Sequence, residues 1–146
     1  MPSARVQGCY NPDVEFDELR QRTENAEKRT AAGDDQGAAA ILAELAESDL
    51  PALDRAMAWT HVAASRDRLG DAPAALAAFD RAIALESPLL RFSAVFKKAD
   101  YLLRLGRKDE SRDLFTSLLT RPEVTLAERH SLESRLKLLR RVPGKK

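Results

Sequence analysis

Few side chains in this sequence are suited to covalent or acid–base chemistry. His61 and His130 are its two histidines, and Cys9 is its single cysteine. A nucleophilic cysteine needs a base beside it, and Cys9 stands near the N-terminus, far from both histidines along the chain. Neither the HExxH nor the CxxC spacing that would hold zinc occurs. We therefore expect no enzyme activity and no metal.

Carboxylate pairs and glycines also have structural explanations. Asp34-Asp35 and Asp109-Glu110 stand where helices are expected to begin, and the helix dipole favours acidic residues there. Gly33, Gly70 and Gly106 are separated by 37 and 36 residues, so they form no phosphate-binding loop. Each is placed to end a helix in a left-handed turn. The sequence predicts no cofactor.

The elements that carry these residues are predicted to be helices throughout, about seven in number. Hydrophobic spacing near 3.6 residues recurs, and no stretch alternates as a strand would. N-cap residues and prolines set the expected starts. The expected helices run from Pro12 to about Ala32, from Asp34 or Asp35 to about Glu47, from Ser48-Asp49 and Pro51 onward, from Asp71 and Pro73 onward, from Ser87-Pro88 to Gly106, from Arg107 to about Thr120, and from the capping box Thr125–Glu128 to about Arg141.

An internal repeat is clearest between Met57 and Ala82. It contains a Trp, an apolar–small pair, and then Gly, Ala, Phe and Ala, at Trp59, Val62, Ala63, Gly70, Ala75, Phe79 and Ala82. This pattern resembles the tetratricopeptide repeat family. Measured from its glycine, the following unit places Val95, Ala99, Gly106, Ser111, Phe115 and Leu118 at the offsets of Trp59, Ala63, Gly70, Ala75, Phe79 and Ala82, and Leu102 at the offset of Arg66. The preceding unit matches at Ala26, Gly33, Ala38, Leu42 and Leu45, with Arg22 where the Trp would stand.

The resemblance implies an all-α solenoid of antiparallel helix hairpins over residues 12–141. We expect repeats at about 15–50, 51–87 and 88–122, a flexible arm at 1–11 and a basic tail at 142–146. Trp59, Phe79 and Phe115 are predicted to be buried between helices.

The helix at 125–141 is expected to cap the open end of the stack. Its core-facing leucines are predicted to be Leu126, Leu132, Leu136 and Leu139, with Arg129, Glu133, Arg135, Lys137 and Arg140 on its other face. A basic patch of Arg135, Lys137, Arg140 and Arg141 leaves a second interpretation open, in which this helix recognises a partner.

The resemblance also implies a concave groove lined by the first helix of each hairpin. From the first repeat it would show Arg20, Thr23, Glu27 and Thr30. From the others it would show Met57, Thr60, His61, Ala64, Arg68, Phe96, Lys97, Asp100, Leu103 and Arg104. Apolar side chains there, as at Met57, Phe96 and Leu103, suggest either a hydrophobic ligand segment or burial by a chain terminus.

Two further features bear on what the groove binds. His61 is suited to hydrogen-bond a ligand or to sense pH, although a partly exposed helix histidine is the commoner case. The clamp of Lys, Asn and Arg with which some family members hold a chaperone C-terminus is not reproduced, because Thr23, Glu27 and His61 stand at three of its positions.

Charge divides the chain in two. Residues 1–73 hold 8 Lys and Arg against 14 Asp and Glu, and residues 74–146 hold 16 against 9. Such polarity favours a charged partner or head-to-tail self-association. We expect the protein to be a protein–protein adaptor or accessory subunit whose partner is a peptide or a helix. An acidic partner would suit the basic C-terminal end. The alternative is a nucleic-acid-associated factor that uses the basic C-terminal helix, although that helix has no aromatic residue to stack on bases.

Composition sets the expected compartment. No apolar run approaches the roughly 18 residues of a membrane span, and one cysteine allows no internal disulfide. Val6-Gln7-Gly8-Cys9 faintly resembles a lipoprotein cleavage site but has no apolar segment before it. The sequence therefore favours a cytoplasmic protein.

Overall fold

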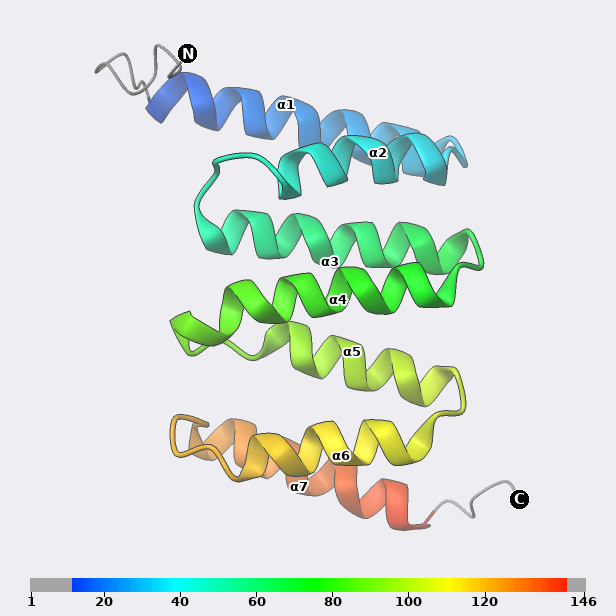
Figure 1. The fold of residues 1–146 in the computed structure, drawn as a ribbon, viewed down its shortest axis with the longest axis vertical. Helices are drawn as coiled ribbons and strands as arrows, with labels where there is room; N and C mark the ends of the chain where they lie inside the picture. Colours follow the sequence, from blue (N-terminus) through cyan, green and yellow to red (C-terminus); the bar gives the residue numbers. More distant parts are fainter. Residues whose placement is uncertain (1–11, 142–146) are drawn as a thin grey trace. The chain divides into compact units, whose positions relative to one another are not determined.

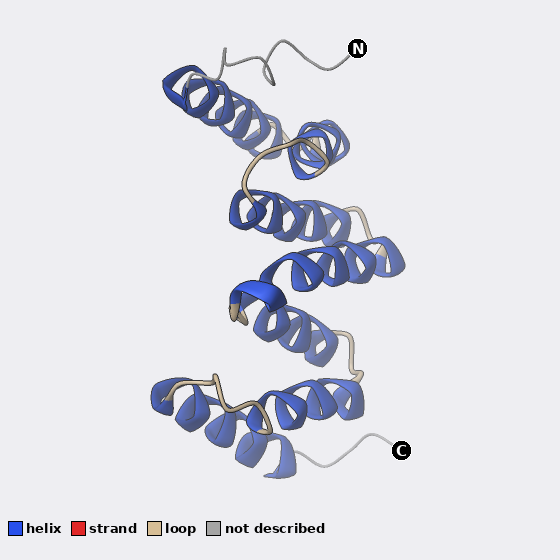
Figure 2. Cartoon of the chain, turned by 60° about the vertical axis from the view of Figure 1, so that its left-hand side comes forward, coloured by secondary structure: helices blue, strands red, loops and turns tan. Residues whose placement is uncertain are grey.

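The computed structural model describes residues 12–141, with side chains from residue 16 to residue 140. This part of the chain is all-helical and contains no strand (Figures 1 and 2). Its elements are α1 (Pro12–Ala31), α2 (Asp35–Ala46), α3 (Ala52–Arg68), α4 (Ala72–Glu86), the 3-10 turn η2 (Ser87–Leu89), α5 (Ser93–Arg104), α6 (Lys108–Leu119) and α7 (Leu126–Arg141). The predicted fold class, with seven α-helices packed on their neighbours as in helical repeats, is confirmed. The expected arm at 1–11 and tail at 142–146 lie outside the described residues.

The chain divides into two compact units. Unit 1 runs to Ala78 and includes α1, α2, α3 and the first part of α4. Unit 2 begins at Phe79 and includes the rest of α4 with α5, α6 and α7. Within each unit, consecutive helices run in opposite directions (Figure 1).

Three glycines end the first helix of each hairpin as predicted. Gly33, Gly70 and Gly106 have φ of +82°, +78° and +80°, the left-handed region that side chains disfavour. In each case the next residue's N–H donates to the carbonyl five residues before it, as in Asp34 to Arg29 at 2.8 Å. This hydrogen bond satisfies a carbonyl that the ending helix leaves free and turns the chain into the second helix.

Predicted caps begin three of the helices, and at the start of α4 the Asp71 carboxylate accepts a hydrogen bond from the Ala74 N–H at 3.1 Å. The Asp34 carboxylate accepts a hydrogen bond from the Gly37 N–H at 2.9 Å at the start of α2. At the start of α7, the Thr125 hydroxyl accepts from the Glu128 N–H at 3.1 Å while the Glu128 carboxylate accepts from the Thr125 N–H at 3.0 Å. These arrangements satisfy N–H groups that the first helical turn leaves free.

The prediction that Ser87-Pro88 opens the fifth helix is wrong. These residues form the turn η2, Leu90 takes a left-handed φ of 56°, and α5 begins only at Ser93. The buried Glu86 carboxylate supplies the cap, because it accepts hydrogen bonds from the Ser93 hydroxyl at 2.7 Å and the Ala94 N–H at 2.9 Å. The cap thus comes from a side chain at the end of the preceding helix, out of reach of a local sequence pattern.

The cores of the two units differ in side-chain size. Alanines dominate the buried set of unit 1, with Trp59 as its one buried aromatic residue among those described. Unit 2 buries larger side chains: Phe92, Val95, Ala99, Phe115, Leu118, Val124, Leu132, Leu136 and Leu139 form one cluster. The predicted burial of Trp59, Phe79 and Phe115 is confirmed.

Candidate functional site

The principal hollow that coincides with predicted site residues lies in unit 1, between α1 and α3. Its volume is about 330 Å³, near the lower end of the range for ligand sites. Its lining comes mainly from α1 and α3, and α2 adds Leu42. We call this hollow the α1–α3 groove; its lining residues are Thr23, Ala26, Glu27, Thr30, Ala31, Leu42, His61, Ala64, Ser65 and Arg68.

Small side chains open this groove. Ala26 and Ala31 of α1 and Ala64 of α3 leave space where larger residues would close the gap between the helices. Thr23 and Thr30 direct their hydroxyls into hydrogen bonds with their own helix, to the carbonyls of the residues four positions earlier at 2.8 and 3.0 Å. With these hydroxyls already satisfied, the walls of the groove are mainly apolar.

The charges on the groove are arranged unevenly. The Arg68 Nε donates to the Asp35 carboxylate at 2.6 Å, and another nitrogen of the Arg68 guanidinium donates to the buried Ser65 hydroxyl at 3.3 Å. The positive charge of Arg68 is thus balanced by Asp35, the first residue of α2. Glu27 is exposed and makes no hydrogen bond or ion pair within the described part of the chain. The carboxylate of Glu27 is therefore a negative charge in the groove lining that has no cation beside it among the described residues.

The structure brings together many of the residues predicted for this half of the groove. Thr23, Glu27, Thr30, His61, Ala64 and Arg68 all line it. Met57 and Thr60 do not: Met57 is 60% exposed elsewhere on α3, and the Thr60 hydroxyl bonds to the Ala56 and Met57 carbonyls. Arg20 pairs with Asp17 on the surface of α1.

In unit 2, Phe96 does not line an open groove. The Phe96 ring is half-buried and lies 6.0 Å from the Phe115 ring, centre to centre. Arg135 of α7 places its guanidinium 5.5 Å from the Phe96 ring and 5.7 Å from the Phe115 ring, and it also pairs with Asp100. The apolar residue is therefore covered by the chain's own terminal helix, one of the two outcomes that its position suggested.

The other predicted residues of α5 remain on its surface. Lys97 and Leu103 are exposed, and Arg104 lies with its guanidinium 5.2 Å from the centre of the Tyr101 ring. Asp100 is half-buried against Arg135. Sequence reasoning placed Arg135 and Asp100 in two separate sites, whereas the structure joins them in one contact.

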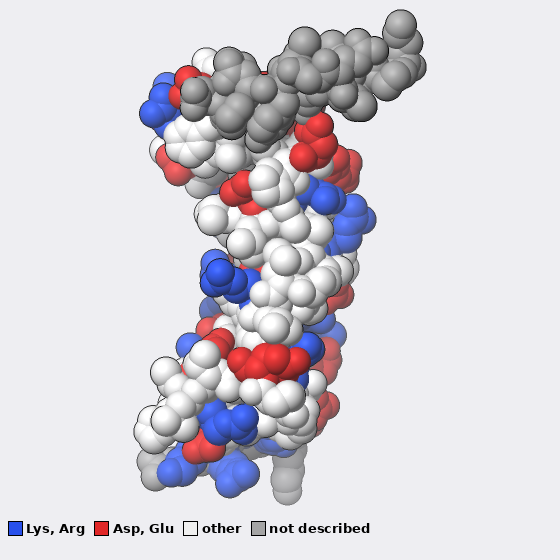
Figure 3. All heavy atoms as spheres, turned by 90° about the vertical axis from the view of Figure 1, so that its left-hand side faces the viewer, with Lys and Arg blue, Asp and Glu red and all other residues white. Residues whose placement is uncertain are grey.

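The predicted basic patch on α7 is smaller than expected. Arg135 is turned toward α5, while Lys137 and Arg140 are exposed; the Arg141 side chain lies outside the described residues. Within unit 2, Lys and Arg side chains do gather around α7 (Figure 3), with acidic side chains close by.

The predicted core face of α7 needs one correction. Leu132, Leu136 and Leu139 are buried, but Leu126 is 83% exposed. A spacing of six residues turns by about 240° around a helix, which places Leu126 away from the face of Leu132. The outer face of this helix also carries the exposed Leu138.

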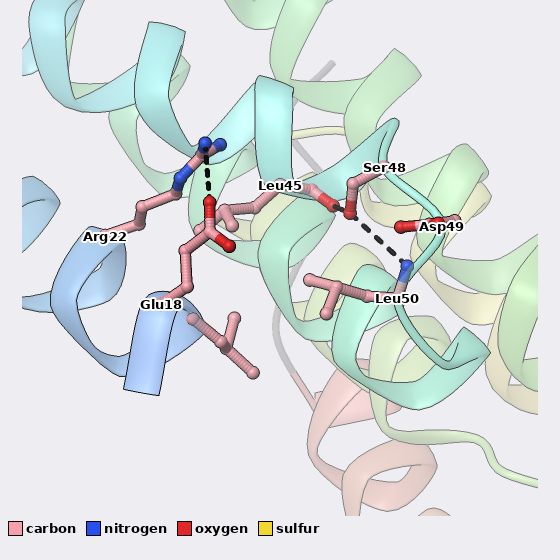
Figure 4. A pocket seen from close by; sticks show the side chains of 7 residues that line it. Glu18, Arg22, Leu45, Ser48, Asp49 and Leu50 are labelled. Atoms are coloured by element: carbon pink, nitrogen blue, oxygen red, sulfur yellow. Dashed lines mark hydrogen bonds and ion pairs between the residues drawn. The ribbon is translucent and has the colours of Figure 1, made fainter. Parts of the chain in front are cut away.

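A smaller cavity of about 90 Å³ in unit 1 is explained by its own hydrogen bonds. Arg22 donates to Glu18 at 3.0 Å, and the Ser48 hydroxyl donates to the Leu45 carbonyl at 2.6 Å. Figure 4 marks both contacts with dashed lines. The Leu50 N–H donates to the same hydroxyl at 3.4 Å. Because these polar groups satisfy one another, the cavity provides no reason to expect a ligand.

A third hollow, of about 510 Å³, lies at the turn between α1 and α2. Its lining includes Arg29 and Asp34, which form an ion pair at 2.8 Å. The N–H of Gly37 and then Arg29 lower the pKa of the Asp34 carboxyl. Arg29 and Asp34 thus serve to cap α2.

Two groups of unit 2, Arg107 and Glu110, also have shifted pKa values. The Arg107 side chain, which makes hydrogen bonds of 2.8 and 2.7 Å, lowers the pKa of Glu110, and the same contact raises the pKa of Arg107. Since the two residues satisfy each other at the start of α6, they serve that helix.

Among residues 16–140, whose side chains the structure describes, no group of three or more histidine, cysteine, aspartate and glutamate side chains is suited to a metal ion. Within residues 12–141, no helix combines the length and apolarity needed to cross a membrane.

Comparison with known proteins gives no match from which a function could be transferred. No protein-family model matches the sequence, and no curated protein is significantly similar to it.

Proposed function

We propose that the chain is a protein–protein interaction module, an adaptor or accessory subunit, and that the α1–α3 groove receives a segment of its partner. The observation that carries this proposal is the groove itself: about 330 Å³, with mainly apolar walls and a carboxylate at its side. Unit 1 supplies it from three helices, mainly α1 and α3 with Leu42 from α2, and helices hold the lining side chains more rigidly than loops would.

The resemblance to tetratricopeptide repeats supports the same function. In that family the first helices of successive hairpins line the binding face, and α1 and α3 are the first helices of the first two predicted repeats. The residues available in the groove are those that bind and orient a peptide. A protein with one cysteine and these properties suits a reducing compartment such as the cytoplasm.

Filling the groove tests this function directly. Ala64→Phe places a ring in the groove, whereas Ala40→Phe makes the same change at an exposed position of α2 outside it. Each variant is immobilised beside the wild type and used for affinity capture with mass spectrometry, with and without nuclease. Circular dichroism and thermal unfolding verify that both variants are folded.

We expect the wild type and Ala40→Phe to capture the same proteins and Ala64→Phe to lose them. Nuclease should not remove these proteins from the wild type. Capture that survives the filled groove would contradict the proposal. Capture that disappears with nuclease would transfer the function to nucleic acid and to the basic residues of α7.

A further inference from the structure

We propose that the segment bound in the α1–α3 groove carries an arginine whose guanidinium pairs with Glu27. This inference rests on the proposed function and specifies the partner's chemistry. It follows from a comparison of this groove with the contact that α5 makes with α7 in unit 2.

Unit 2 contains its own example of such a contact. Arg135 approaches α5 from α7, pairs with Asp100 and covers the Phe96 ring. Asp100 stands six residues before Gly106, and Glu27 stands six residues before Gly33. Measured from the turn glycine, the two carboxylates hold the same place on their helices, but only Asp100 has a cation.

The charges around the groove favour a cation as the missing group. Arg68 is held by Asp35 and Ser65, so it leaves the negative charge of Glu27 uncompensated. Residues 1–73 also hold six more acidic than basic residues, which attracts a basic segment over a longer range. The partner we infer for this groove is therefore basic, opposite to the acidic partner that the basic end of the sequence suggested.

The walls of the groove favour arginine with an aliphatic neighbour. An arginine can lay its methylene chain along Ala26, Ala64 and Leu42 while its planar head reaches a carboxylate. Two N–H groups can then bond to the two carboxylate oxygens of Glu27. Lysine carries the same charge but lacks this paired geometry, so it should bind less tightly.

Peptide selection on the intact protein tests the inference. The probe is a phage-displayed library of random 12-residue peptides, selected on the wild type and depleted on Ala64→Phe so that peptides bound outside the groove are removed. The same selection is repeated on Glu27→Lys. Glu24→Lys provides the matched control, because it makes the same charge change at an exposed residue of α1 that does not line the groove.

We expect arginine beside leucine or isoleucine to be enriched on the wild type and on Glu24→Lys. On Glu27→Lys the enrichment should change to aspartate and glutamate. Individual peptides should bind Glu27→Lys about tenfold more weakly, as expected when an ion pair is replaced by repulsion.

The outcomes separate the two proposals. Groove-dependent peptides without a basic preference, or with one that Glu27→Lys leaves unchanged, would overturn the arginine inference and leave the proposed function standing. If no peptide distinguishes the wild type from Ala64→Phe, both fail.

Discussion

The α1–α3 groove of unit 1 and the α5–α7 contact of unit 2 solve the same packing problem in opposite ways. In unit 1 the facing residues are small, as at Ala26 and Ala64, and a hollow of about 330 Å³ remains. In unit 2 the corresponding space holds the Phe96 ring and the Arg135 side chain. Both helix pairs present a carboxylate, but only in unit 2 does the chain supply the cation.

This difference shows how a repeated helical scaffold separates binding from stability. Large side chains between helices exclude water and stabilise the fold, and they leave no room for a ligand. Small side chains give up that stabilisation and create a surface that a partner can fill. The α5–α7 contact of unit 2 is therefore more tightly packed, and the α1–α3 groove of unit 1 has more room for a partner.

The largest effect should follow from emptying the packed contact. Phe115 is 1% exposed and lies against Phe96 and Arg135. Phe115→Ala should lower the free energy of unfolding by about 3–5 kcal/mol, measured by urea unfolding, because the cavity is enclosed. Leu42→Ala at the α1–α3 groove should cost about 2–3 kcal/mol, since that space already adjoins an open hollow. Equal costs, or a nearly harmless Phe115→Ala, would show that the two regions do not differ in packing.

A smaller effect should follow from removing the cation of unit 2. Arg135→Ala loses a partly exposed ion pair and its contacts with two rings, so we expect a cost of about 1–2 kcal/mol. Arg135→Lys should recover part of this loss, because it keeps the charge without the planar head. Arg140→Ala, at an exposed position of the same helix, should change stability by less than about 0.5 kcal/mol. If Arg140→Ala and Arg135→Ala cost the same, Arg135 does not hold α7 against α5.

Local sequence signals predicted the helices well because the physical causes are local. The glycines fix left-handed turns, and the caps of α2 and α7 use side chains within three residues of the groups they satisfy. The resemblance to tetratricopeptide repeats implied that Thr23, Glu27, His61 and Arg68 would line one groove, and these four residues do line the same hollow.

The features missed by sequence reasoning depend on residues distant in the chain or on their side-chain conformations. The start of α5 is set by Glu86, a carboxylate on the preceding helix. The covering of Phe96 is set by Arg135, which hydrophobic spacing placed on a solvent-facing patch. A long arginine side chain can bend back over a ring, and no periodicity of residue types reveals which of its neighbours it will choose.

The smallest effect compares two adjacent alanines of α3. Ala63 has 0% exposure and is packed inside unit 1, whereas Ala64 lines the open groove. Ala63→Leu must fit three extra carbon atoms into filled space and should cost about 1–3 kcal/mol. Ala64→Leu places the same atoms in the groove, where it should change stability by less than about 0.5 kcal/mol. Thermal and urea unfolding of both variants measure the difference, and their helical content should match the wild type by circular dichroism. Because the two substitutions are identical in chemistry and differ by one position, helix propensity cannot account for a contrast between them. Equal costs at the two positions would mean that the groove closes in solution, and the binding function assigned to it would lose its space.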